Sequence, residues 1–289
     1  MNQLQKIILV TGATGGQGAA TVYHLVKKGY SVRGLTRMPD SARAERIASL
    51  GVELFKGDLE DRSALEIAMK GVYGAYVFLP TIMDKEREIR QGKLVIDVVK
   101  KTGIKHLVFS SMGLCEQNRG VPHIDSKREV ERYIKNLEIP ATFLWPGIFM
   151  EDLVDQRFFP PGVWGMMYTI VGPDKQVQWV AIDDIGFVGA SVFDDPDKFI
   201  GQTIPVIGDK KSIAEVREIF KRVTGHKPFR LLLPAWFFSR FAPHGRELVS
   251  MFKAHHITPF DWDTTLVREI HPEIMDIKSW LKCTVEASL

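Results

Sequence analysis

The sequence predicts an α/β fold, in which a doubly wound parallel sheet is accompanied by a smaller α/β C-terminal lobe. Short apolar runs alternate with helical patterns through the first half of the chain. The first apolar run leads into a glycine-rich turn that opens a helix, and the alternation stops near Glu151. Repeated strand–helix alternation is typical of a parallel sheet with helices on both of its faces.

The composition is that of an ordinary globular protein. The chain has 289 residues, of which 45% are hydrophobic and 25% charged, and this fits one large domain or a domain with a smaller lobe. The formal net charge is only +3, and the basic residues are spread along the chain. The composition therefore does not favour a nucleic-acid partner. Cys115 and Cys283 are the only cysteines. They indicate neither a disulfide framework nor a metal site, and a reducing, cytoplasmic location is expected.

No stretch approaches the roughly 18 apolar residues of a membrane-spanning helix, so no membrane partner is expected. The most apolar candidate, LLLPAWFFSRF at 231–241, is interrupted by Pro234 and contains Arg240. We interpret it as a packed helix or a cover over a pocket, with a membrane-surface anchor as the alternative.

The pattern places six strands and five helices in the first half of the chain. The expected strands lie at 7–10, 30–35, 52–58, 75–80, 106–111 and 141–147. The expected helices lie at 17–28, 41–50, 61–70, 85–102 and 125–136. Ligands of such sheets bind at the carboxyl ends of the strands, near the point where the strand order reverses. The residues that follow each strand are therefore the candidates for a site.

The turn after the first strand, TGATGGQG, predicts a binding site for a dinucleotide. Gly12 permits the tight turn, Gly15 lets a diphosphate come close, and Gly18 lets the helix lie against the sheet. The unpaired amides of the first helical turn would bind the diphosphate. Thr14, Gly16 and Gln17 complete the loop. The alternative is a glycine turn without a ligand.

Arg37 favours NADP(H) over NAD(H). The second strand ends in Leu35, Thr36 and Arg37, and no carboxylate follows until Asp40. A carboxylate would bind the free ribose 2′-hydroxyl of NAD, whereas an arginine suits the 2′-phosphate of NADP. The alternative is that Arg37 is a solvated charge at the end of a strand.

Two further strand ends carry candidate cofactor contacts. Asp58 and Leu59 follow the third strand, where the adenine edge would lie, and Asp58 either binds the adenine amino group or caps the next helix. Leu79 and Pro80 end the fourth strand and would flank the ribose and nicotinamide, with core packing as the alternative.

The chain is expected to divide into an NADP-binding domain at 1–150 and a smaller lobe at 151–289, which would bind the substrate or partner, with segments that cross between them. Short strands are expected at 176–182 and 203–207, and an amphipathic helix at 213–224. We expect Asp183 and Asp184 to cap the helix that follows them.

Several stretches together resemble the NmrA-like family, in the atypical branch of the short-chain dehydrogenase/reductase superfamily. They are TGATGGQG, VRGLTR, GDLED, EREIRQGKLVIDVVKKTGIKHLVFSSM, PHIDSKREVERYI, IPATFLWPGIFMEDL and DDPDKFIGQTIPVIG, which together cover nearly the whole chain. The resemblance implies a Rossmann fold, a preference for NADP(H), and a C-terminal lobe that forms part of a substrate pocket.

The superfamily motif Y-x-x-x-K corresponds here to His123 and Lys127. The resemblance implies that Lys127 binds the nicotinamide ribose; the alternative is a solvated helix cation. His123 replaces the tyrosine, and it is either a general acid or a spacer in a protein that binds the cofactor without turnover. Ser111, or Ser110, lies where the superfamily keeps a serine that binds the substrate oxygen, with capping of the strand end as the alternative.

The resemblance also places Pro146, Gly147 and Phe149, after the sixth strand, against the nicotinamide carboxamide. Two functions follow as expectations. The first is an NADPH-dependent oxidoreductase that reduces a small apolar carbonyl, enone, quinone or imine. The second is a non-catalytic NADPH/NADP+ redox sensor that regulates a protein partner. A monomer or a homodimer fits either function.

Overall fold

The computed structural model describes residues 6–80, 84–113, 120–241, 245–257 and 262–286. It consists of two compact units. The first unit contains Met1–Gln117, His123–Trp145 and Ile185–Ile204, and the second contains Asn118–Pro122, Pro146–Asp184 and Pro205–Leu289. The chain therefore leaves the first unit after Trp145 and returns to it from Ile185 to Ile204, a segment that holds most of one helix, a second short helix and the start of a strand.

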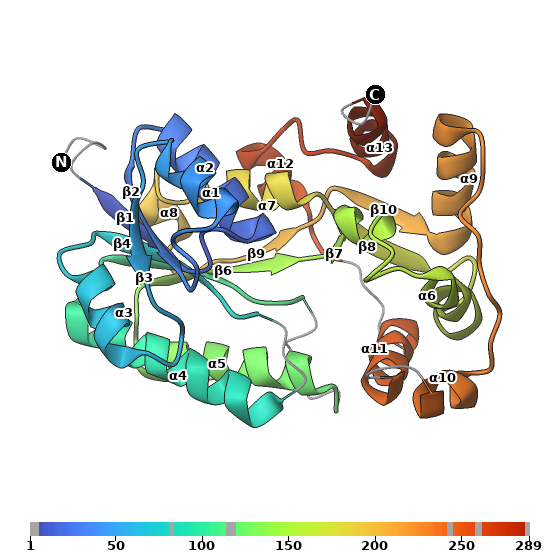
Figure 1. The fold of residues 1–289 in the computed structure, drawn as a ribbon, viewed down its shortest axis with the longest axis horizontal. Helices are drawn as coiled ribbons and strands as arrows, with labels where there is room; N and C mark the ends of the chain where they lie inside the picture. Colours follow the sequence, from blue (N-terminus) through green and yellow to red (C-terminus); the bar gives the residue numbers. More distant parts are fainter. Residues whose placement is uncertain (1–5, 81–83, 114–119, 242–244, 258–261, 287–289) are drawn as a thin grey trace. The chain divides into compact units, whose positions relative to one another are not determined.

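A seven-stranded sheet forms the centre of the first unit, in the order β3-β2-β1-β4-β5-β6-β9 (Figure 1). Its strands are β1 (Ile7–Val10), β2 (Ser31–Thr36), β3 (Glu53–Lys56), β4 (Gly74–Phe78), β5 (His106–Ser110), β6 (Ala141–Pro146) and β9 (Thr203–Val206). The strands from β3 across to β6 pair in parallel. The strand order reverses between β1 and β4, so the predicted doubly wound fold is confirmed.

Helices cover both faces of this sheet (Figure 1). They are α1 (Gly16–Lys27), α2 (Ala42–Ala48), α3 (Arg62–Met69), α4 (Lys85–Thr102), α5 (Pro122–Asn136), α7 (Ile182–Ser191) and α8 (Pro196–Phe199). The helices α3, α4 and α5 lie on one face, and α1 and α2 lie on the other. The helix α7 also packs on the second face, because a Cβ on its Gly186 would lie 2.5 Å from the backbone of Ala20 in α1.

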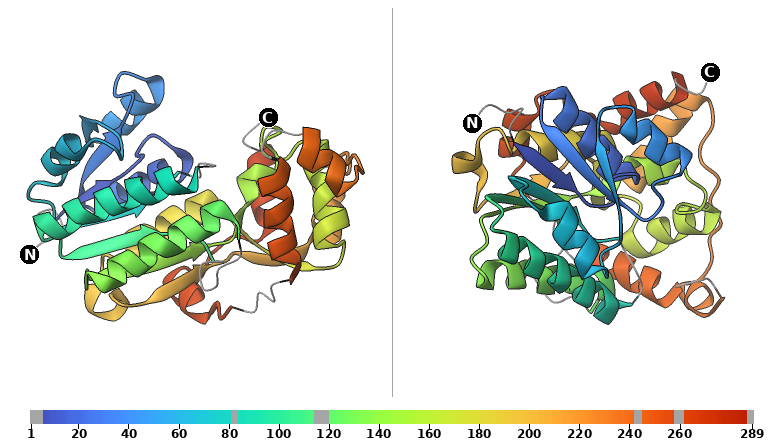
Figure 2. Two further views of the ribbon diagram at one scale, coloured as in Figure 1. Left: turned by 90° about the horizontal axis from the view of Figure 1, so that it is seen from below. Right: turned by 60° about the vertical axis from the view of Figure 1, so that its left-hand side comes forward.

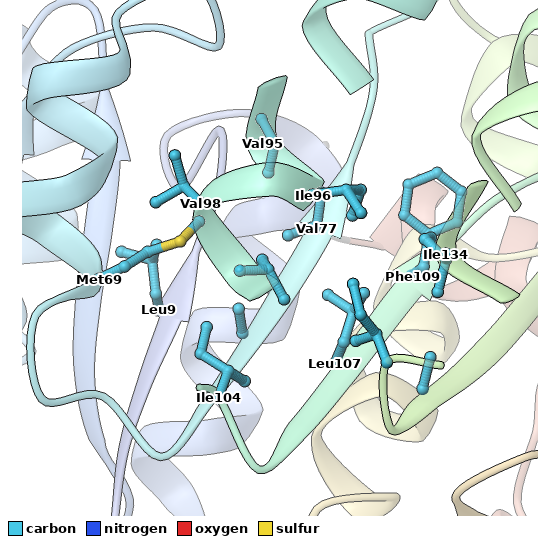
Figure 3. Close-up of a cluster of buried hydrophobic side chains, with 14 of the residues drawn as sticks. Leu9, Met69, Val77, Val95, Ile96, Val98, Ile104, Leu107, Phe109 and Ile134 are labelled. Atoms are coloured by element: carbon cyan, nitrogen blue, oxygen red, sulfur yellow. The ribbon is translucent and has the colours of Figure 1, made fainter. Parts of the chain in front are cut away.

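The core of the first unit lies between the sheet and the helices α3, α4 and α5 (Figure 3). Leu9, Val77, Leu107 and Phe109 from the strands meet Val95, Val98, Ile134 and Met69 from the helices, and all of them are buried. Burial of a side chain of this size stabilises the fold by about 1.5–3 kcal/mol. Burial on both faces explains why these strands have apolar sequences without alternation.

Gly92 sets the distance between α4 and α5, which run side by side (Figure 2). A Cβ at this position would lie 2.4 Å from Cγ2 of Val130 and 3.0 Å from Cδ1 of Leu79. Valine is stiff at χ1 and cannot easily turn away. The absence of a side chain at Gly92 therefore lets the two helices pack closely near the carboxyl end of β4.

The second unit has a three-stranded sheet in the order β10-β8-β7. Its strands are β7 (Ile148–Phe149), β8 (Gln176–Val180) and β10 (Asp209–Ser212). Its helical segments are the 3-10 turn η2 (Met150–Leu153), α6 (Pro161–Met166), the π-helical turn η3 (Met167–Val171), α9 (Ile213–Thr224), α10 (Ala235–Phe241), α11 (Gly245–Ile257), α12 (Thr265–Ile270) and α13 (Ile277–Glu286). Trp164, Trp179, Phe252 and Trp280 form part of a separate buried core.

In the part of the chain that the structure describes, no helix combines the length and apolar character needed to cross a membrane.

The prediction that Asp183 and Asp184 cap a helix is wrong, because α7 begins at Ile182 and both residues lie in its first turn. The carboxylate of Glu151 accepts the backbone N–H of Ile182 instead, at 3.0 and 3.1 Å. Asp184 fastens the C-terminal segment: it accepts the N–H of Met275 at 3.0 Å and lies 2.8 Å from Nε2 of His271.

The apolar stretch at 231–241 packs through only one of its faces. Phe238 of α10 is buried, and its ring lies so close to Gly162 that a Cβ there would approach to 2.5 Å. Leu232, Trp236 and Phe241 are more than half exposed. The expectation of a packed helix therefore holds for Phe238, and Leu233 is partly buried against the same core, whereas Leu232, Trp236 and Phe241 lie on the surface.

His106 is a buried titratable group in the first unit, and it makes stability depend on pH. Its Nε2 lies 2.8 Å from Oγ1 of Thr142, and its ring packs edge-on against Phe193. Burial, with a smaller contribution from the charge of Lys6, lowers the pKa of His106 to about 4. The folded protein therefore holds this histidine neutral at pH values where the unfolded chain protonates it.

We predict that acid destabilises the protein through His106. The contribution is fully present above the unfolded pKa of about 6.5 and is lost as the pH falls towards 4, because only the unfolded state takes up the proton in this window. Its full size is about 3 kcal/mol. Urea unfolding between pH 4.5 and 7 should show a flatter pH dependence for His106→Gln than for the wild type. The exposed His226→Gln serves as the control and should keep the wild-type slope. Equal slopes for His106→Gln and the wild type would contradict this explanation.

Candidate functional site

The turn between β1 and α1 requires glycine at two positions, Gly12 and Gly18. Gly12 has a φ of +56°, and a Cβ there would also lie 2.7 Å from the ring of Phe78. A Cβ on Gly18 would lie 2.3 Å from the carbonyl oxygen of Gly12. The start of the helix therefore rests directly on the turn. A side chain at Gly18 would separate the two, and a side chain at Gly12 would collide with Phe78.

Gly15 lies on the open side of the turn. A Cβ there would meet only the Gly12 oxygen, at 3.3 Å, and no side chain caps α1. The amides of Gly16, Gln17 and Gly18 belong to the first turn of the helix and have no intrahelical acceptor. These donors lie at the carboxyl end of β1, beside the reversal of strand order. Such a set of bare amides at a helix N-terminus fits a diphosphate.

The side chain of Gln17 points into the protein. Its Nε2 donates to the Tyr76 hydroxyl at 2.8 Å and to Oγ of Ser110 at 2.5 Å. Burial raises the pKa of Tyr76, which stays a neutral hydroxyl. The side chain of Gln17 thus connects α1 to β4 and β5, and only its backbone amide is available to bind a ligand. The same contacts occupy Ser110.

The end of β2 carries the cation that the sequence singled out. Arg37 is exposed, and the structure records no ion pair for it among the residues described. Arg33, by contrast, is bound to Glu53 at 2.8 Å and to the Lys70 carbonyl at 2.7 Å. Arg37 is therefore the arginine of this strand end that is available to a ligand.

Thr36 connects this strand end to the glycine turn. Its buried Oγ1 lies 3.1 Å from Oγ1 of Thr14 and accepts the N–H of Met38 at 3.3 Å. The turn and the segment that carries Arg37 are thus held in fixed register. The sequence named Thr14 as a loop residue but gave no signal for its contact with Thr36.

Asp58 does not cap the helix that follows it. The cap of α3 is Asp61, whose Oδ1 accepts the N–H of Ala64 at 3.0 Å. Oδ1 of Asp58 closes a short turn by accepting the N–H of Glu60 at 2.8 Å, and the residue is exposed. Leu59 is half-buried against the core. Of the two interpretations of Asp58, capping is wrong, and adenine binding stays a prediction.

The candidate site residues at the ends of β4 and β5 differ in how far they are buried. Leu79 is buried in the core beside Gly92, whereas Pro80 is exposed. Ser111 follows β5, is buried, and donates its N–H to the Leu144 carbonyl at 2.9 Å. Pairing with β6 therefore continues to the level of Ser111.

The helix α5 begins at Pro122, before the predicted start at 125, so His123 lies in its first turn. Its buried face carries four polar residues, namely His123, Ser126, Lys127 and Glu131. Residues three and four apart share one face of a helix, so His123 and Lys127 lie on the same side. The interpretation of Lys127 as a solvated cation is wrong, because the residue is only 4% exposed.

Glu88 on α4 is a polar residue that sequence reasoning missed. It is 0% exposed, and its Oε1 accepts from Lys127 Nζ at 2.7 Å and from Ser126 Oγ at 2.8 Å. The signal was present, because Glu88 lies on the helix face that also holds Gln91 and Val95. An acidic residue on such a face needs a cationic partner.

The remaining predicted cofactor contacts belong to the second unit. Pro146 ends β6 and is buried, and Phe149 ends β7 and is half-buried. A Cβ on Gly147 would lie 2.6 Å from the Gln178 carbonyl, so this glycine lets the chain pass closely beside β8.

Asp152 is a second polar residue that the sequence analysis missed. Partial burial, followed by the charges of Glu151 and Asp155, raises the pKa of Asp152 to about 7. Hydrogen bonds from Arg157 hold the pKa of Asp155 at about 2. At neutral pH the two carboxyl groups thus differ, and Asp152 alone retains a proton for part of the time. The sequence shows only three acids in a short stretch; the burial of Asp152 and the hydrogen bonds from Arg157 to Asp155 make their behaviour different.

Comparisons with known proteins support one family. The model of the "NmrA-like family" matches residues 4–280. The NmrA-like family domain-containing oxidoreductase malD of Malbranchea aurantiaca is 31% identical over 264 residues, which are 82% of this chain and 78% of that protein.

Two solved structures have the same fold. NmrA, described as a negative transcriptional regulator, in complex with NADP, superimposes with a TM-score of 0.77 at 22% identity over 99% of this chain and 98% of that chain. The Citrobacter sp. triphenylmethane reductase complexed with NADP(H) gives a TM-score of 0.79 at 18% identity over 98% of this chain and 99% of that chain. With a family model that matches nearly its whole length, this chain belongs to the NmrA-like family.

Proposed function

We propose that the protein binds NADP(H) and reduces a small apolar carbonyl, enone, quinone or imine by hydride transfer. The observation that carries this proposal is the uncapped first turn of α1, with its bare amides at the reversal of strand order. The relative from Malbranchea aurantiaca is described as an oxidoreductase, and the two solved structures are described as complexes with NADP or NADP(H).

The residues present fit the cofactor. The amides of Gly16, Gln17 and Gly18 would hold the diphosphate, Arg37 would bind the 2′-phosphate, and Lys127 would bind the nicotinamide ribose. Asp58, Leu59, Leu79 and Pro80, with Pro146, Gly147 and Phe149, are proposed as further contacts. When bound, the reduced cofactor supplies a hydride. The protein's own contribution is then orientation, exclusion of water and a proton for the substrate oxygen or nitrogen.

His123 and Ser111 are the proposed proton donors in the first unit. An imidazole is a side chain that can transfer a proton at neutral pH. Its place in the first turn of α5, on the face that carries Lys127, supports this role. A hydroxyl at Ser111 would bind the substrate oxygen.

A second candidate is a redox sensor that turns over no substrate. The absence of the superfamily tyrosine favours it. So do the large apolar side chains of Phe229 and Trp236, which are 72% and 66% exposed and offer a surface for a protein partner. A sensor requires that the two redox states of the cofactor bind with different affinities or shapes.

We predict that the wild-type protein oxidises NADPH in the presence of at least one quinone, enone, aldehyde or imine. His123→Ala should lower kcat by about 100-fold or more, the usual contribution of a general acid, while the dissociation constant for NADPH stays near the wild-type value. The assay follows NADPH absorbance, with binding measured separately by fluorescence titration. No turnover on a broad panel, together with tight NADPH binding, would support the sensor instead. Full activity in His123→Ala would remove this residue from the chemistry.

We predict that Arg37→Ala weakens NADPH binding by about tenfold to 100-fold and leaves NADH binding unchanged, because a charged hydrogen bond contributes about 1.5–3 kcal/mol. Calorimetric titration of both cofactors measures the preference. Arg222→Ala makes the same charge change at an exposed position on α9 and should change neither affinity. A preference for NADPH that survives in Arg37→Ala would show that another group binds the 2′-phosphate.

A further inference from the structure

Glu88 and Lys127 form a buried ion pair that none of the sequence motifs explains. Glu88 is fully buried, the Lys127 side chain is 5% exposed, and the two charged groups are 2.7 Å apart. Ser126 donates to the same carboxylate oxygen at 2.8 Å. Each charge depends on the other, because an unpaired charge in the interior is strongly unfavourable.

The pair lies towards the ligand-binding edge of the sheet. Glu88 precedes Gly92 by one helical turn, and Lys127 precedes Val130 by about one turn, so the pair lies N-terminal to the close contact of α4 with α5. These helices follow β4 and β5 in the chain. Their N-terminal ends therefore lie near the carboxyl ends of those strands, where doubly wound sheets bind ligands.

A structural role alone does not account for the pair. A buried ion pair often stabilises a fold no more than a well-packed apolar pair of the same volume, and the neighbouring contacts of Gly92 with Val130 and Leu79 are apolar. What the pair does supply is an ammonium group with a fixed position and a balanced charge. Glu88 uses one of the three N–H donors of lysine, so the group retains donors for a ligand.

We infer that Glu88 is a positioning residue for Lys127, and that its negative charge sets the relative affinity of the site for NADP+ and NADPH. The inference rests on the proposed function, in which Lys127 binds the nicotinamide ribose. The oxidised ring carries one more positive charge than the reduced ring, so a fixed charge nearby acts differently on the two forms. The Lys127 ammonium disfavours the oxidised form, and the carboxylate in contact with it offsets that effect.

The test measures the dissociation constants of NADP+ and NADPH by calorimetry at pH 6.5, about four units below the ordinary pKa of lysine. In Glu88→Gln, binding of NADP+ should weaken about tenfold more than binding of NADPH, which raises the reduction potential of the bound couple by about 30 mV. Lys127→Met should shift the ratio of the two constants in the opposite direction. The double variant Glu88→Gln/Lys127→Met should return the ratio to the wild-type value while both forms bind more weakly.

The control is Glu129→Gln, which removes the same charge from a side chain of α5 that is 40% exposed, and it should leave the ratio unchanged. Circular dichroism and thermal unfolding check that each variant is folded. An unchanged ratio in Glu88→Gln, or shifts of the same sign in both single variants, would overturn the inference. If Glu88→Gln does not fold, an unchanged ratio in Lys127→Met would overturn it. A wild-type protein that binds neither nucleotide would refute the proposed function itself, so the two failures are distinguishable.

Discussion

The contact between Gly18 and the carbonyl oxygen of Gly12 is the constraint on which the candidate site depends. A Cβ at Gly18 would lie 2.3 Å from that oxygen, so the first turn of α1 can rest on the turn after β1 only because the side chain is missing. This approach brings bare helix amides to the carboxyl end of β1. The strand order reverses at the same place. The bare amides therefore lie at the edge of the parallel sheet where α4 and α5 also have their N-terminal ends.

Polar groups within the first unit hold this region in register through a small number of buried bonds. Gln17 joins α1 to β4 and β5, Thr36 joins β2 to the glycine turn, and Glu88 joins α4 to α5. Each contact connects residues that are distant in sequence. In a low-dielectric interior such bonds are strong when both partners are present and costly when one is removed. The polar groups thus define the site geometry, whereas the apolar core supplies most of the stability.

Much of the fold was predictable because each element carries its own local signal. The apolar run of β1 and the helix α4, whose bounds agree with those predicted, depend on residues within the element. By contrast, β10 has the polar sequence DKKS and becomes a strand only by pairing with β8. The site followed the same division. The glycines and Arg37 stand in a recognisable pattern, and Glu88 lies on a helix face that the sequence marks as buried. Its pairing with Lys127 depends on how α5 lies against α4, which no local pattern reports.

The inward-pointing side chain of Gln17 has a consequence for how a nucleotide would associate with the protein. The residue that presents one of the bare amides is fastened through its side chain to two central strands. The set of bare amides at the start of α1 is thereby pre-organised. Its conformational entropy is lost when the chain folds rather than when a ligand binds. A diphosphate that bound these amides would require little rearrangement of them, so differences in affinity between nucleotides would arise at the two ends of the dinucleotide.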